Sequence, residues 1–169
     1  MTINNALRNL EYRLDGLKNK NKSYESITWF CERFAHDFVY LASPYSSPWD
    51  QLKKNRFKEI SLIAAYLYRQ LIKLNTVIYS PICHGVPMAV VDKNLQGDYE
   101  YWRKFDEAFM LKSTKLMVVC MGGWKKSKGV RAEIDFAKQI DLPIYYCFTK
   151  NRSMFITNKD SDLVGFNLG

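Results

Sequence analysis

Residues 115–121, with the sequence KLMVVCM, form the most apolar run of the chain, and GGWKKSKGVRAEIDFAKQI follows at residues 122–140. An unbroken apolar run of this length predicts a strand buried on both faces, as strands of parallel sheets are. The residues after it predict a loop and then an amphipathic helix. In open α/β sheets ligands bind beyond the carboxyl ends of the strands. The unit therefore predicts an α/β domain whose site includes this loop.

Strands and helices alternate on both sides of this unit. The other predicted strands are FVYLA (38–42), TVIYS (76–80), PIYYCF (143–148) and a short last one at MFIT (154–157). One helix is predicted from about Gln51 to Leu74, and another carries Tyr101, Phe105, Phe109 and Met110, whereas residues 81–97 are expected to be irregular. This order predicts a Rossmann-like (flavodoxin-like) three-layer α/β domain over residues 37–169, with a mainly parallel sheet of about five strands.

Three loops should meet at the carboxyl ends of these strands: SPYSSPWD (43–50), SPICHGVP (80–87) and GGWKKSKGV (122–130). Neither the GxGxxG pattern of dinucleotide-binding folds nor the GxxxxGK[ST] pattern of P-loops occurs in the chain.

Residues 1–36 are predicted to form a helical extension in front of this domain. Apolar residues recur at steps of four and three, which is a seven-residue repeat on a helix: Ile3, Leu7, Leu10, Leu14 and Leu17. Ser23 is placed to cap a second helix with Ile27, Phe30, Cys31 and Phe34 on one side. A short helix is marginal in water, so its apolar face must dock on its own domain or on another subunit. The repeat favours a homo-oligomer.

The chain has 169 residues, of which 47 % are hydrophobic and 25 % charged, as expected for one globular domain. It has neither an apolar run long enough to cross a membrane nor a secretory signal, so we expect a cytoplasmic protein with no membrane partner. The net charge of +8 points to an anionic partner. The aromatic residues follow apolar-periodic segments, which makes nucleic acid an unlikely partner.

Four cysteines, at positions 31, 83, 120 and 147, are scattered through apolar surroundings. Their spacing is not that of a zinc or redox motif, and we expect buried thiols. With two histidines in the chain, no metal site is predicted.

Glu133 lies shortly after Gly129, on what is predicted to be the first turn of a helix, and four basic residues surround it: Lys125, Lys126, Lys128 and Arg131. An acid there often offsets the positive end of the helix dipole. The alternative is a catalytic carboxylate, because the residue follows a buried strand and the nearby bases are expected to lower its pKa and keep it ionised.

The segments YLASPY, SPICH and FDEAF, then a long apolar strand, then S-x-G-V-x-x-E, occur in one order. In this order the chain resembles the nucleoside 2-deoxyribosyltransferases and the related 2'-deoxynucleoside 5'-monophosphate N-glycosidases. It is most similar to a branch with the signatures YLASPYS and GWxxSxGVxxE. The resemblance covers about residues 38–147 and leaves residues 1–36 outside.

The resemblance implies roles for individual residues. Glu133 falls on the family's nucleophile, Asp106 on the acid that assists departure of the base, and Tyr40 on the tyrosine that orients the nucleophile. Ser127 falls where monophosphate-cleaving relatives bind the phosphate, which favours a nucleotide over a nucleoside. Arg131 stands where many transferases have glycine; it would reshape the sugar pocket or reach a phosphate.

Further residues of the three loops are candidate substrate contacts: Ser43, Tyr45, Ser46, His84, Trp124 and Gly129. Each has a structural alternative. Asp106 can be a solvated helix acid, Tyr40 ordinary strand packing and Ser127 a loop residue. Serines and prolines at 43–50 suit turns, His84 can be structural, and Trp124 can cover the core instead of a base.

The implied chemistry is that of a retaining glycosidase. One carboxylate captures C1' of the sugar while an acid protonates the leaving base, and water or a second base completes hydrolysis or transfer. This mechanism needs no cofactor. Two alternatives stay open: a non-catalytic nucleotide-binding or sensing module, and a deoxyribosyltransferase acting on unphosphorylated nucleosides. A third, charge-driven nucleic-acid binding, predicts salt-sensitive binding to any strand.

Overall fold

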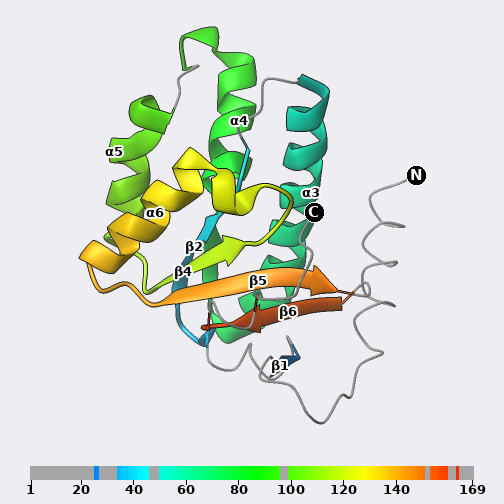
Figure 1. Cartoon of the computed structure of the whole chain (residues 1–169), viewed down its shortest axis with the longest axis vertical. Helices are drawn as coiled ribbons and strands as arrows, with labels where there is room; N and C mark the ends of the chain where they lie inside the picture. Colours follow the sequence, from blue (N-terminus) through cyan, green and yellow to red (C-terminus); the bar gives the residue numbers. More distant parts are fainter. Residues whose placement is uncertain are drawn as a thin grey trace.

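Figure 1 shows the computed structural model of the chain, which describes residues 25–26, 34–45, 50–95, 99–150, 153–159 and 163. Its strands are β1 (Glu25–Ser26), β2 (Phe38–Ala42), β3 (Val77–Tyr79), β4 (Lys115–Val119), β5 (Ile144–Lys150) and β6 (Ser153–Thr157). Its helices are α3 (Asp50–Leu71), α4 (Pro81–Val91), α5 (Tyr99–Met110) and α6 (Lys128–Gln139). Short 3₁₀ turns in the described part of the chain are η2 (Ile72–Leu74), η3 (Lys93–Leu95) and η4 (Trp124–Lys126).

The strands form one mixed sheet in the order β1-β6-β5-β4-β2-β3. β2 pairs in parallel with both β3 and β4, and β4 pairs in parallel with β5. β6 runs antiparallel to β5, and β1 antiparallel to β6. The five strands from β2 onwards therefore have the flavodoxin-like order 2-1-3-4-5, with the last one reversed. This confirms the predicted Rossmann-like fold with a mainly parallel sheet.

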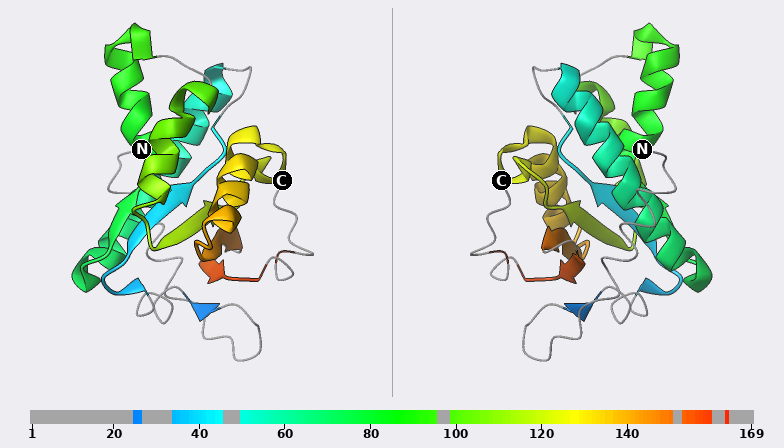
Figure 2. Two further views of the ribbon diagram at one scale, coloured as in Figure 1. Left: turned by 90° about the vertical axis from the view of Figure 1, so that its left-hand side faces the viewer. Right: turned by 90° about the vertical axis from the view of Figure 1, so that its right-hand side faces the viewer.

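Helices cover both faces of the sheet, and Figure 2 shows α3 and α6 on opposite sides of it. Alternate residues of β2 divide between the two faces because successive side chains of a strand point in opposite directions. Val39 and Leu41 are buried in a cluster with residues of α3, whereas Tyr40 and Ala42 are buried in a cluster with residues of α6. The sheet thus has one apolar core on each face, and Tyr40 points toward the core beneath α6.

Residues 81–91 differ from the sequence prediction of an irregular segment, since they form the helix α4. Ser80 caps this helix, because its hydroxyl accepts a hydrogen bond from the Cys83 backbone N–H at 3.3 Å, and Pro81 occupies the first helical position, where proline is favoured. Pro87 lies inside the helix and Gly85 lowers its propensity, so the sequence pattern did not indicate a helix here.

The N-terminal segment is described at a few positions, so most of the predicted extension, with its seven-residue repeat, lies outside the described residues. Glu25–Ser26 fall inside the second predicted helix, and there the prediction is wrong: they pair with Phe155 and Ile156 of β6 as a strand. Phe34 is fully buried against the α3 face, with its ring 5.1 Å from that of Tyr145. Parts of the segment before residue 37 therefore belong to the sheet and core of the domain.

No helix in the described part of the chain is both long and apolar enough to span a membrane.

Candidate active site

Glu133 lies on the inner face of α6. The helix begins at Lys128 because the Ser127 side chain caps it, accepting a hydrogen bond from the Val130 backbone N–H at 3.4 Å. Glu133 is consequently in the second helical turn, whereas the sequence pattern suggested the first. It shares the buried stripe of the helix with Val130 and Ala137, and its exposed fraction is 7 %. An acid in this position does not serve as a solvated dipole partner.

Tyr40 holds the Glu133 carboxyl group from the direction of the sheet. Its hydroxyl donates a hydrogen bond of 2.8 Å to Glu133 Oε1, and its side chain is fully buried. Burial, together with the nearby acids Glu133 and Asp106, raises the pKa of Tyr40 well above its ordinary value. The phenol therefore stays protonated and acts as a permanent donor to this carboxyl group.

Asp106 brings a second carboxyl group to the same place from α5. Its exposed fraction is 8 %, and among the described residues its Oδ1 atom has no hydrogen-bond partner. A buried polar atom without a protein partner is costly and uncommon, so this oxygen is a candidate contact for a ligand or an ordered water.

Both carboxyl groups hold their protons more tightly than acids in water. Burial raises the pKa of Glu133 to about 8, with a further rise from Asp106, although the hydrogen bond from Tyr40 lowers it. Burial likewise raises the pKa of Asp106 to about 6, against the lowering effect of Tyr40. At pH values between these two pKa values the pair holds one proton. The expectation that nearby bases lower the pKa of Glu133 is wrong, because burial of this carboxyl group dominates while the four basic side chains are exposed to solvent.

A cavity of about 400 Å³ contains both acids. Residues that follow β2 and β4 line it, so it lies where the strand order reverses, which is the ligand site of such sheets. Among the described residues, three buried side-chain atoms lack a hydrogen-bond partner, namely Ser43 Oγ, Tyr79 OH and Asp106 Oδ1. All three residues line this cavity. Their convergence indicates that the cavity is built to receive a polar ligand.

Several residues predicted from the sequence meet here. Ser43, Tyr45, Ser127 and Gly129 line the cavity together with Asp106 and Glu133, and Tyr40 supports Glu133 from below. Ser46 lies outside the described residues.

Three other predicted contacts do not line the cavity. Arg131 is exposed, because the buried stripe of α6 turns position 131 outward. Trp124 is buried in the core, 5.7 Å from the Tyr146 ring, which is the structural alternative considered for it. His84 is exposed and its ring stacks on Phe105 at 5.9 Å.

The cavity also has lining residues that sequence reasoning missed, chief among them Lys53, Tyr79, Trp102 and Phe105. Lys53 is the one basic residue among the described residues that line it. It belongs to the first turns of α3, directly after the loop that follows β2. The position of this lysine, shortly after the carboxyl end of a central strand, is the sequence signal that could have identified it as a site residue.

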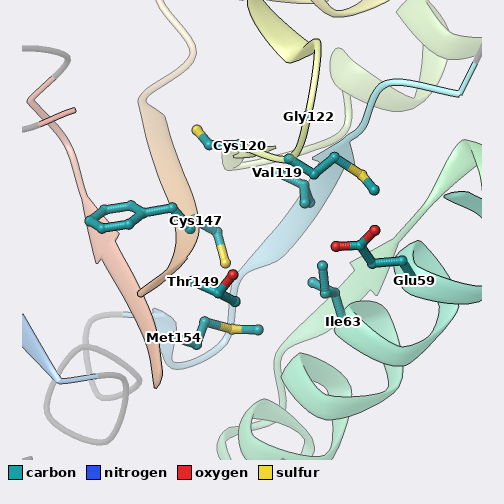
Figure 3. A pocket seen from close by; sticks show the side chains of 10 residues that line it. Glu59, Ile63, Val119, Cys120, Gly122, Cys147, Thr149 and Met154 are labelled. Carbon is teal, nitrogen blue, oxygen red and sulfur yellow. The ribbon is translucent and has the colours of Figure 1, made fainter. Parts of the chain in front are cut away.

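A second cavity of about 230 Å³ lies between α3 and strands β4 to β6 (Figure 3). Figure 3 shows the Glu59 carboxylate facing it from α3, with Thr149 and Met154 on the other side. Cys120 and Cys147 are also among its lining residues, and both are buried, as predicted, whereas Cys83 is only partly buried and Cys31 lies outside the described residues. Burial raises the pKa of Cys147 to about 12, so this sulfur is unreactive. The cavity contains none of the predicted site residues.

Fold and site together define a Rossmann-like domain with a buried pair of acids where its strand order reverses. The chain belongs to the family described as "Domain of unknown function (DUF1937)", whose pattern matches residues 37–147. The matched region runs from just before β2 into β5, and so includes the parallel strands, Tyr40, both acids and the three loops. Among curated proteins, no sequence matches the chain.

Proposed function

We propose that the protein cleaves the N-glycosidic bond of a nucleoside 5'-monophosphate whose sugar is ribose or 2'-deoxyribose. The observation that carries this proposal is that Glu133 and Asp106 line one cavity at the switch point of the sheet, with the Tyr40 hydroxyl hydrogen-bonded to Glu133. Two acids and a phenol of this kind suit a reaction in which positive charge develops on a sugar ring. The order of sequence motifs, similar to that of nucleoside 2-deoxyribosyltransferases, independently suggests the same chemistry.

In the proposed first step a Glu133 carboxylate oxygen forms a bond to C1' of the sugar. The bond between C1' and the base nitrogen breaks, its electron pair stays on the base, and the Asp106 carboxyl group gives its proton to the base. In the second step the Asp106 carboxylate takes a proton from water, whose oxygen bonds to C1' and releases Glu133. A second base in place of water gives transfer instead of hydrolysis.

The proton of the acid pair has to be on Asp106 when the base leaves. Of the two acids Glu133 has the higher pKa, so substrate binding must shift the proton to Asp106. Positive charge developing at C1' favours the ionised form of the nearest carboxyl group, and the hydrogen bond from Tyr40 also favours ionised Glu133. The pair therefore has the single proton that the reaction uses, and the substrate determines its position.

The phosphate is assigned to the polar end of the cavity. Ser127 and Gly129 lie there at the start of α6, where free backbone N–H groups and the helix dipole favour an anion. Lys53 adds a positive charge, and Ser43 adds a buried hydroxyl without a partner among the described residues. These groups favour a 5'-phosphate over a free 5'-hydroxyl.

The test is incubation with a panel of deoxynucleoside and ribonucleoside monophosphates and the corresponding nucleosides, with released base measured by chromatography. Release from monophosphates that disappears in Glu133→Ala supports the proposal. Equal release by that variant, with circular dichroism confirming its fold, contradicts the mechanism. Binding of nucleotides without any release of base would instead favour the non-catalytic sensing module.

Homo-oligomerisation and a cytoplasmic location remain parts of the proposal. The oligomer rests on the apolar repeat of the N-terminal segment, which lies outside the described residues. Light scattering on the full chain tests it. A full-length monomer at micromolar concentration contradicts it.

A further inference from the structure

The two sides of the acid-containing cavity differ sharply in chemistry. The residues contributed by β2 and its loop, β3, α3 and α6 are polar or glycine: Ser43, Tyr45, Lys53, Tyr79, Ser127, Gly129 and Glu133. The residues contributed by α4, η3 and α5 are, except for Asp106, apolar or glycine: Pro81, Ile82, Gly85, Val86, Ala89, Val90, Leu95, Trp102 and Phe105. The cavity is thus amphipathic, with its apolar wall on the α4–α5 side.

The apolar wall has the pattern of a helix face that should be covered. On α4 the lining positions 82, 85, 86, 89 and 90 follow the spacing that normally turns toward a core. Yet none of the residues of α4 is buried, and Val90 remains 69 % exposed. Gly85 faces α5, and a Cβ atom there would meet the Trp102 ring at an ordinary contact distance of 3.8 Å. Ile82 packs against the core on the α3 face, whereas Val86, Ala89 and Val90 form an apolar surface that the described residues leave partly open.

Asp106 connects this wall to the chemistry, since it is the one acid among the described residues of the wall. In the proposed reaction Asp106 protonates the leaving base, so the base must lie against the same wall. Apart from Asp106 and the indole N–H of Trp102, these side chains have no hydrogen-bonding group. They can recognise apolar area and ring faces, whereas they leave the polar edge of a plain base unpaired.

We propose that the substrate is a nucleotide whose base carries an apolar substituent, such as an alkyl group, and that Val86, Ala89 and Val90 bind this substituent. The inference rests on the proposed function, because it takes the base to be the group beside Asp106. Burial of one CH₂ group changes an affinity by about fourfold. Affinity should therefore increase by about this factor with each of the first two or three methylenes.

The experiment uses two series of probes: 2'-deoxyuridine 5'-monophosphate with hydrogen, methyl, ethyl or propyl at C5, and 2'-deoxyadenosine 5'-monophosphate with the same groups on N6. Their Kd values are measured by calorimetry on the full-length Glu133→Gln variant, which cannot form the proposed intermediate, and base release is measured on the wild type. We expect Kd to fall with alkyl length in at least one series. Kd values that stay constant or rise with length in both series overturn the proposal.

Val90 and Val91 provide a matched pair of controls, because Val90 lines the cavity and Val91, 88 % exposed, does not. In the Glu133→Gln background, Val90→Asn should remove most of the dependence of Kd on alkyl length, whereas Val91→Asn should keep it. Ala89→Leu should move the optimum to a shorter substituent, because the added side chain fills the wall. Equal effects of the two asparagine variants contradict the assignment.

Failure of this inference and failure of the proposed function are distinguishable. If alkyl nucleotides bind tightly and no base is released by the wild type, the apolar subsite stands and the glycosidase proposal falls. If nucleotides without an alkyl group are cleaved best, the glycosidase proposal stands and the apolar subsite falls. If Val90→Asn changes the oligomeric state in light scattering and leaves the alkyl dependence intact, the wall is a contact between subunits and the inference is overturned.

Discussion

The hydroxyl of Tyr40 donates a hydrogen bond of 2.8 Å to Oε1 of Glu133, across 93 positions of sequence. It joins the central strand β2 to the inner face of α6 in a fully buried setting. Because the phenol remains protonated, the bond fixes the carboxyl group and leaves its other oxygen available to the cavity.

Replacing Tyr40 by phenylalanine should slow base release by about 10- to 100-fold, the loss expected for one hydrogen bond to a charged group. The ring still fills its place in the core, so the fold should persist. Steady-state kinetics of the variant measure the effect. An unchanged kcat, with a thermal transition like that of the wild type, would show that Tyr40 only packs.

The rate of base release should have a bell-shaped pH dependence, with limbs near pH 6 and pH 8, where the acid pair gains or loses its proton. Burial is the main cause of the raised pKa of Glu133, and Asp106→Asn removes the charge that raises it further. In that variant the pKa of Glu133 should fall, and the limb near pH 8 should disappear. Profiles of kcat/KM test this, and a flat profile in the wild type contradicts it.

Glu133→Gln should stabilise the protein at neutral pH. The folded-state pKa of about 8 lies above the ordinary 4.5, so the wild type loses stability as pH rises between these values, while the variant does not. The gain in unfolding free energy should be about 3 kcal/mol at pH 7 and close to zero at pH 4. Urea denaturation at both values measures it. A gain of the same size at pH 4 would exclude the carboxyl group as its cause.

Lys53→Gln should weaken the binding of nucleoside monophosphates, seen as a higher KM, and leave the KM for nucleosides nearly unchanged. The reason is that Lys53 lines the cavity, and a neutral hydroxyl gains little from a cation. Lys126→Gln is the matched control, since that lysine is exposed and does not line the cavity. Ser127→Asp should have the same selectivity as Lys53→Gln through repulsion of like charges. Equal changes in KM for both substrate classes contradict the phosphate assignment.

Gly123→Ala should destabilise the fold by about 1–2 kcal/mol. Gly123 has a φ of 82°, and a Cβ atom would lie 3.2 Å from the Arg56 guanidinium, which donates to the Gly122 carbonyl oxygen. Gly85→Ala is a useful contrast, because its nearest contact is an ordinary 3.8 Å and alanine favours the helix. Denaturation of both variants tests the pair, and destabilisation by Gly85→Ala alone contradicts this interpretation of the two glycines.

The fold was predictable because the apolar patterns of its main strands and helices are long and regular in the sequence. The apolar run of β4 and the stripe of α3 each extend over many residues, and the alternation of strands and helices then leaves few topologies. α4 was missed because Pro87 and Gly85 weaken every helical signal except its cap. The two residues of β1 are too short to have a period at all.

Site residues were predictable from the sequence where their position relative to the end of a strand determines whether they lie at the site. Tyr40 and Ser43 belong to β2 and its carboxyl end, and Glu133 follows the buried strand β4. Side-chain direction was harder, since one step along α6 separates buried Val130 from exposed Arg131. The pKa of Glu133 was misjudged because charges near in sequence are screened by solvent, whereas burial is a property of the tertiary structure.

The pairing of β2 with β4 joins Leu41 to Met117, residues that are far apart along the chain. The acid pair and its phenol therefore come together only when this long-range pairing has formed, so no local segment can hold a competent site by itself. A ligand in the cavity would be released by any opening that separates β2 from α6. Amide hydrogen exchange should consequently slow in β2 and α6 by the same factor on ligand binding, as one cooperative unit.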